Sequence, residues 1–170
     1  MINTCSNGSN LSGLASEDFR KEINHKETVL FILKNSLGME AAVTNYGCAI
    51  LSIMVPDREG KYANVILGHD SIDHVINSPE PFLSTTIGRY GNRIAKGKFT
   101  LYGEEHQLTI NNGPNSLHGG PTGFHTRVWD AVQPDETTVI FNYTSADGEE
   151  GFPGKVEVEM TYRLENETNA

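Results

Sequence analysis

Regular alternation of apolar and polar residues near the end of the chain constrains its fold more than any other feature. Between residues 155 and 164 every second residue is apolar, namely Val156, Val158, Met160, Tyr162 and Leu164. Successive side chains of a β-strand point to opposite faces of a sheet, so this period of two gathers the apolar side chains on one face. A sheet with one apolar face is normally covered by a second layer. The alternation therefore predicts an all-β fold, an antiparallel β-sandwich whose outer face meets water.

Runs of β-forming residues separated by turn residues supply the other expected strands. These runs are residues 28–34, 39–46, 48–55 and 62–67, with a hairpin over residues 98–110 around Gly103. The segment Pro56-Asp57-Arg58-Glu59-Gly60 predicts the turn after which residues 62–67 return antiparallel. Short helical turns are expected over residues 71–77 and after Ser16 as a cap.

The length of the chain suits a single domain. A chain of 170 residues can bury a sizeable core. Residues 1–15 are rich in Ser, Asn and Gly and are expected to be a flexible leader, so residues 16–170 form the expected sandwich portion. The sequence stops a few residues after a strand that needs a partner sheet. We therefore expect residues 16–170 to be the N-terminal part of a larger sandwich.

Charge and hydropathy exclude several classes of partner. With 13 Lys and Arg against 22 Asp and Glu, the net charge of −9 disfavours nucleic acids and anionic membranes. No window is long and apolar enough for a membrane helix, and the first ten residues carry no export signal, which indicates a cytoplasmic protein. A periplasmic or lipid-anchored protein is the alternative if an export signal was removed. Cys48, inside an apolar run, is expected to be a buried thiol.

Two stretches combine glycines with directional hydrogen-bonding side chains. They are Gly88-Arg89-Tyr90-Gly91-Asn92-Arg93-Ile94 and Asn115-Ser116-Leu117-His118-Gly119-Gly120. Glycines let a backbone turn or approach a ligand closely, and Asn, Arg and His supply the donors that hold a polyhydroxylated molecule. The two stretches therefore favour a neutral small-molecule ligand.

Each of these residues also has a structural reading. His118 could be a loop histidine satisfied by backbone groups. In a regular strand Arg89 and Arg93 share a face and Asn92 points oppositely, so a turn or bulge at Gly91 is needed before all three can meet one ligand. Alternatively, one of the arginines is a structural partner for carboxylates elsewhere.

The remaining candidate groups give weaker signals. The other histidines show no metal-binding spacing, so no metal site is expected. Glu149 and Glu150 lie in a probable turn, where a solvated charge is the default interpretation. Phe124 and Trp129 could stack on a sugar, but packing in the core is the stronger expectation.

Taken in order along the chain, several motifs resemble those of the aldose 1-epimerases, or galactose mutarotases. The motifs are Thr44-Asn45-Tyr46-Gly47, residues 55–60, Leu67-Gly68, residues 88–94 and Leu117-His118-Gly119-Gly120. The resemblance runs from about Phe19 to Leu164. It implies interconversion of the α and β anomers of aldoses such as galactose and glucose, without a cofactor. By the match of motifs, Asn92 and Arg93 would bind sugar hydroxyls, and His118 would sit beside the ring oxygen and support proton transfer.

The resemblance also implies groups that this sequence lacks. The family's acid histidine belongs to an Asn-His-x-Tyr-Phe-Asn-like motif and its base is a glutamate near the full-length C-terminus, and neither is found here. We therefore expect little activity from this chain alone, and self-association or pairing with a missing C-terminal half. The alternatives are a non-catalytic carbohydrate-binding module and a structural half-domain that needs a partner chain.

Overall fold

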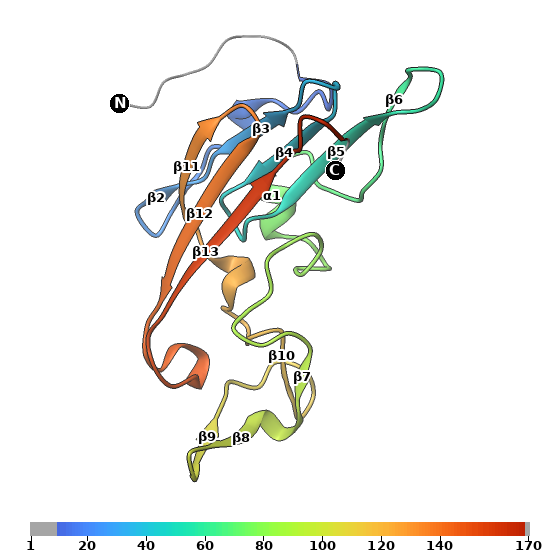
Figure 1. Cartoon of the computed structure of the whole chain (residues 1–170). Helices are drawn as coiled ribbons and strands as arrows, with labels where there is room; N and C mark the ends of the chain where they lie inside the picture. The colour runs from blue at the N-terminus through green and yellow to red at the C-terminus, as the bar shows by residue number, and fades with distance from the viewer. Residues whose placement is uncertain (1–9, 169–170) are drawn as a thin grey trace.

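The computed structural model describes residues 10–168 and shows two antiparallel sheets packed in layers (Figure 1). The first sheet has four strands in chain order: β3 (Leu30–Lys34), β4 (Glu40–Thr44), β5 (Ile50–Pro56) and β6 (Tyr62–Asn64). The expected hairpin from β5 to β6 is confirmed, but β6 is shorter than expected. The Asn64 side chain accepts hydrogen bonds from the backbone N–H groups of Ile53 and Ile66 and so replaces regular pairing where the strand ends.

The second sheet has three strands, β11 (Asp130–Asp135), β12 (Thr138–Ser145) and β13 (Val156–Arg163). Strands β12 and β13 pair over their whole length, from Thr138 opposite Arg163 to Ser145 opposite Val156. Val158, Met160 and Tyr162 are half-buried and pack against the core, while the residues between them are exposed. The period-two prediction for this strand, and the antiparallel β-fold that it implies, are confirmed.

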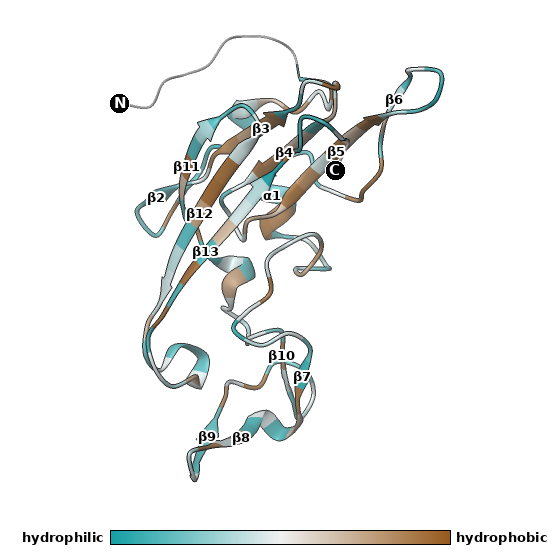
Figure 2. Cartoon of the chain, viewed as in Figure 1, coloured by the Kyte–Doolittle hydropathy of each residue, from teal (hydrophilic) through white to brown (hydrophobic). Residues whose placement is uncertain are grey.

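The space between the two sheets holds the main core. Its buried members come from both layers and include Val43 and Cys48 of the first sheet side and Val139, Phe141 and Trp129 of the second. Figure 2 shows the apolar residues concentrated along β3, β4, β5 and β12. Cys48 is a buried free thiol, as expected, and burial raises its pKa well above the ordinary range. Cys5 lies outside the described residues.

The other face of the first sheet is covered by short helical segments. The 3-10 helix η1 (Ser16–Phe19) contributes Phe19, and the α-helix α1 (Ile72–Ile76) contributes Ile72 and Val75. The Ser71 hydroxyl caps α1 by accepting from the His74 N–H. Ser16 does not cap η1, because the residue before the helix is Ala15 and makes no side-chain cap. The expected cap at Ser16 is therefore wrong, although a helical turn does follow.

The first segment of the described chain is attached to the sheet by a buried carboxylate. Glu40 is 0% exposed, and one of its oxygens accepts from the backbone N–H groups of Leu11 and Ser12. Its other oxygen lies 3.1 Å from the Lys34 ammonium. Residues 1–9 of the expected flexible leader lie outside the described residues.

The turn after β4 connects the two sheets. The buried Asn45 side chain accepts from the Val29 N–H and donates to the carbonyls of Glu27 and Trp129. Gly47 follows with φ 60°, and a Cβ atom there would lie 2.4 Å from the His125 carbonyl oxygen. The motif at residues 44–47 therefore holds the fold together at the point where the sheets meet.

Three two-stranded pairs complete the structure. They are β1 (Glu22–Ile23) with β2 (Lys26–Glu27), β7 (Arg93–Ile94) with β10 (Ser116–Leu117), and β8 (Lys98–Leu101) with β9 (Glu104–Gln107). The last pair confirms the hairpin expected around Gly103. Figure 1 shows β7 to β10 at the end of the molecule farthest from β6. The polar stretches of the sequence thus lie in a loop-rich region next to the sandwich.

Candidate functional site

The pairing of β7 with β10 brings the two Gly-rich polar stretches together. Arg93 lies opposite Leu117 and Ile94 opposite Ser116. Asn92, just before β7, and His118, just after β10, therefore lie beside each other at the same end of this pair. Pairing across a long loop is what places an amide, a guanidinium and an imidazole on one small surface. The three sequence-predicted residues Asn92, Arg93 and His118 are therefore neighbours in space.

Asn92 and His118 are joined by two reciprocal hydrogen bonds. The Asn92 N–H donates to His118 Nδ1 over 3.0 Å. The His118 N–H donates to the Asn92 carbonyl oxygen over 3.0 Å. An Nδ1 atom that accepts a hydrogen bond carries no proton, so the neutral imidazole has its proton on Nε2. Nε2 makes no hydrogen bond with residues 10–168 and is reached by solvent, which leaves it free to donate to a ligand.

Left-handed backbone at both residues makes this contact possible. Asn92 has φ 70° and His118 has φ 52°. Asparagine tolerates this region better than most residues, and its turn redirects the chain as the sequence analysis required, at Asn92 itself rather than at Gly91. The backbone strain of His118 is consistent with a position whose geometry is fixed by its surroundings.

Arg93 extends this surface. Its Nη1 donates to the Asn92 side-chain oxygen over 3.2 Å and its Nε donates to Asn112 Oδ1 over 2.9 Å. The Asn92 side-chain nitrogen makes no hydrogen bond within residues 10–168 and remains available as a donor. Both Asn92 and Arg93 are exposed. The surface is thus rich in donors and carries one fixed positive charge.

Glycines let the loops around the site approach each other closely. Gly119 has φ 86°, and a Cβ atom there would lie 1.8 Å from the carbonyl oxygen of Gly88. The same carbonyl accepts from the Phe124 N–H. At Gly88 a Cβ atom would lie 2.1 Å from the Phe124 ring. The glycines next to Arg89 and His118 therefore serve backbone packing.

Arg89 is a structural residue. Its guanidinium donates to the Ser145 hydroxyl and to the backbone carbonyls of Ser145, Ala146, Pro153 and Gly154. One alternative expected from the sequence was an arginine that pairs with carboxylates elsewhere in the fold. Arg89 instead binds four carbonyls and a hydroxyl, and so attaches the segment before Asn92 to the loop between β12 and β13.

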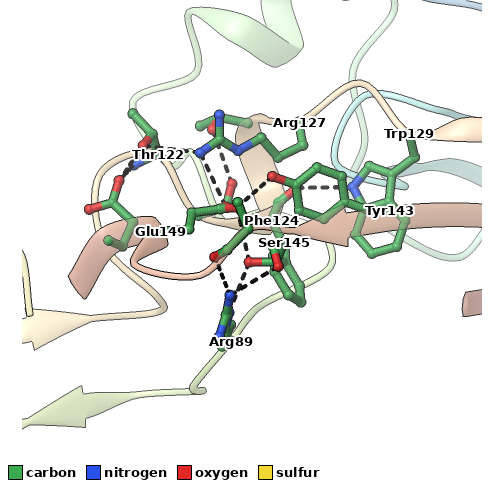
Figure 3. Close-up of polar contacts among 12 residues, drawn as sticks. Arg89, Thr122, Phe124, Arg127, Trp129, Tyr143, Ser145 and Glu149 are labelled. Atoms are coloured by element: carbon green, nitrogen blue, oxygen red, sulfur yellow. Dashed lines mark hydrogen bonds and ion pairs between the residues drawn. The ribbon is translucent and has the colours of Figure 1, made fainter. Parts of the chain in front are cut away.

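Glu149, at the start of the 3-10 helix η4 (Glu149–Gly151), gathers three donors in the same region (Figure 3). One oxygen accepts from the hydroxyls of Tyr143 and Ser145 over 2.7 and 2.9 Å, and the other pairs with Arg127 at 3.1 Å. Burial, followed by the bond to Glu149, raises the pKa of Tyr143 to about 12. The default interpretation of Glu149 as a solvated turn charge is wrong, because the turn folds this carboxylate back onto β12.

Phe82 and His125 are parts of the site region that sequence reasoning missed. The Phe82 ring contacts two imidazoles, with its centroid 4.7 Å from that of His118 and 4.6 Å from that of His125. His125 is 3% exposed, and burial, with a smaller contribution from His118, lowers its pKa from 6.5 to about 4. No local pattern signals this stack, because Phe82 reaches the histidines from a turn distant in sequence.

Phe124 and Trp129 belong to the core, as expected. Both are buried, and their rings meet edge to face with centroids 5.6 Å apart. The Trp129 Nε1 donates to the Phe124 carbonyl oxygen. Within residues 10–168 no group of His, Cys, Asp and Glu is arranged to hold a metal ion.

Solved structures with the same fold show to which class of protein the chain is similar. A GalM/aldose epimerase homologue from C. elegans superposes with a TM-score of 0.76 at 30% identity, covering 81% of this chain and 42% of that one. The galactose 1-epimerase from Lactobacillus acidophilus NCFM gives a TM-score of 0.74 at 30% identity, with coverage of 86% and 43%. The architecture is that of the mutarotase-type antiparallel β-fold.

The sequence comparison assigns the family. The family model described as Aldose 1-epimerase matches residues 29–169, and the chain belongs to the aldose 1-epimerase family. Galactose mutarotase of Bos taurus is 43% identical over 123 residues, which are 72% of this chain and 35% of that protein. Aldose 1-epimerase of Escherichia coli K12 is 38% identical over 135 residues, or 79% and 39%.

Two further findings concern the extent of the match and the helices of the chain. The chain spans little more than a third of the length of these curated relatives. In the part of the chain that the structure describes, no helix has the length and apolar character needed to cross a membrane.

Proposed function

We propose that Asn92, Arg93 and His118 form one wall of an aldose-binding site, and that this chain is the sugar-holding part of an aldose 1-epimerase. The observation that supports it most is the reciprocal bonding of Asn92 and His118, which leaves a solvent-accessible Nε2–H on a surface rich in donors. A neutral sugar offers hydroxyl and ring oxygens that accept from such donors.

The proposed chemistry is acid–base opening and closing of the sugar ring. A base removes the proton of the anomeric hydroxyl, an acid protonates the ring oxygen, the C1–C2 bond rotates in the open form, and reclosure gives the other anomer. His118 would donate from Nε2 to the ring oxygen and so stabilise the negative charge that develops on this oxygen as the ring opens. Asn92 and Arg93 would hold neighbouring hydroxyls in place.

Sugar titration by calorimetry tests the binding wall. Asn92→Gly and His118→Asn remove the side-chain groups while keeping residues that tolerate a left-handed backbone. Loss of one such hydrogen bond corresponds to roughly tenfold weaker binding of galactose. Asn24→Gly and His25→Asn are matched controls, because both residues are exposed and have φ of 50° and 63°. Equal binding by the site variants and the wild type would refute the assignment.

Polarimetry tests whether this chain catalyses mutarotation by itself. We expect the 170-residue chain to change the rate of mutarotation little beyond the spontaneous rate, because the acid and base that the family resemblance implies have no counterpart in its sequence. A rate near that of complete family members would show that this chain supplies both groups itself. Binding without catalysis is also the outcome expected of the non-catalytic carbohydrate-binding alternative, and absence of binding would favour a structural half-domain.

A further inference from the structure

The Phe82 ring contacts both the site histidine, His118, and a second, buried histidine, His125. Its plane is tilted by 53° to the His118 ring and by 55° to the His125 ring, at centroid distances of 4.7 and 4.6 Å. Phe82 comes from the turn after α1, whereas the two histidines flank the loop that follows β10. Three rings from two distant segments thus form one stack, and only its His118 end belongs to the proposed sugar site.

The hydrogen bond from Asn92 holds the His118 ring at one edge only. The Asn92 N–H fixes Nδ1, but a ring anchored at one atom can still swing about its side-chain torsions. A second contact against the ring face removes that freedom. Phe82 makes this contact, and aromatic pairs at such distances contribute beyond the area that they bury.

His125 makes the second ring contact with Phe82, at a centroid distance of 4.6 Å. Its side chain is buried, and Nδ1 has no hydrogen-bond partner within residues 10–168. Glu150, Arg127 and His118 are the charged or titratable groups that act on it. Because the His125 ring is buried and in contact with Phe82, we take its role here to be packing against that ring.

We propose that Phe82, backed by His125, is a positioning residue that keeps the His118 ring in the orientation in which Nδ1 accepts from Asn92 and Nε2–H faces a ligand. This role rests on the proposed sugar site. Phe82 is not assigned a contact with the sugar. Its effect on binding would pass through the orientation and tautomer of His118.

Long-range proton–nitrogen NMR spectra of the histidine rings in the full chain test this directly. The His118 signals are assigned as those missing from His118→Asn, and the pattern reports which ring nitrogen carries the proton. We expect the wild type to show a single Nε2–H tautomer. Phe82→Leu fills similar space without a ring face and should give a mixture of tautomers, while Phe82→Tyr should retain the wild-type pattern. Tyr102→Leu is the matched control, because Tyr102 is 98% exposed.

Galactose titration of the same variants provides the second readout. Phe82→Leu should weaken binding about three- to tenfold, and Phe82→Tyr should restore it. An unchanged His118 tautomer in a folded Phe82→Leu protein would overturn the positioning role, whatever the sugar affinity. A changed tautomer in a chain that binds no sugar, even as wild type, would instead uphold the positioning role and refute the proposed site.

His125→Phe tests the backing ring separately. It keeps a ring against Phe82, so the His118 tautomer should stay as in the wild type, whereas His125→Leu should shift it part of the way toward the Phe82→Leu mixture. A shift of equal size in both variants would mean that His125 does not act as packing support. Dispersed amide spectra show that each variant is folded.

Discussion

The Arg89 guanidinium donates through Nε to the hydroxyl of Ser145 over 2.8 Å, and so attaches the segment before Asn92 to the end of β12. The carbonyl of Ser145 and three backbone carbonyls of the loop between β12 and β13 accept the remaining donors of Arg89. Loops carry most of the proposed site, and these hydrogen bonds anchor one of the loops to the sandwich.

Replacing Arg89 should destabilise the whole fold. Lysine keeps the charge but cannot serve several carbonyls at once, so Arg89→Lys should lower the free energy of unfolding by roughly 2–4 kcal/mol. Urea unfolding followed by Trp129 fluorescence measures the change. Arg58→Lys, at an exposed position in the turn after β5, should change it little. Equal stability of both variants would mean that the Arg89 contacts contribute nothing net.

Gly119→Ala should be among the most damaging single substitutions. The new Cβ atom would meet the Gly88 carbonyl oxygen at 1.8 Å, and φ of 86° disfavours any side chain. We expect a loss of at least about 3 kcal/mol or failure to fold. Gly103→Ala is the matched control, because Gly103 has φ 87° with no atom near its Cβ position, so only the backbone cost of about 1 kcal/mol applies. Similar losses for the two variants would contradict the close-approach argument.

Stability should fall as the pH drops below neutral because of His125. Its folded pKa of about 4 lies below the unfolded value of 6.5, so the unfolded chain takes up the proton first. The contribution is fully present above pH 6.5 and is lost as the pH falls toward 4. It amounts to about 3 kcal/mol at most. Urea unfolding across this range should show a steeper decline for the wild type than for His125→Phe, and parallel curves would count against it.

Strand β13 should promote self-association. Within the described residues it pairs with β12 alone, and Val156 is 39% exposed on it. A strand edge with unpaired backbone groups and half-buried apolar side chains favours pairing with another chain. Size-exclusion chromatography should show species larger than a monomer that diminish in Val156→Lys. Tyr102→Lys, in the turn between β8 and β9 where Tyr102 is 98% exposed, is the control. A monomer at high concentration would show that this edge is not used.

Local sequence patterns were sufficient for elements whose neighbours are near in sequence. The alternation in β13, the turn before β6 and the hairpin around Gly103 each depend on a few consecutive residues, and each is found. Strand β11 gives no such pattern, because nearly all of its residues are exposed and neither face is apolar. The end of β6 depended on the Asn64 side chain, which no periodicity reports.

The site was less accessible to sequence reasoning, because its parts meet only after folding. Residue types and glycines marked Asn92, Arg93 and His118, but their proximity depends on the pairing of β7 with β10. The role of Arg89 depends on contacts with a loop far along the chain, such as that with Ala146, 57 residues away. The role of Glu149 depends on the turn that folds its carboxylate back onto Tyr143. A turn charge and a buried hydrogen-bonding carboxylate have the same local sequence, so only the folded path distinguishes them.

The hydrogen bonds of the Asn45 side chain show that a motif shared within this family can serve folding alone. Its amide is fully occupied by Glu27, Val29 and Trp129, so the motif around it can be retained for the sake of folding alone. A homologue that keeps Thr44-Asn45-Tyr46-Gly47 but has lost the equivalents of Asn92 and His118 would still be recognised as a relative. Genome surveys that use the site proposed above should therefore filter on the second set of positions.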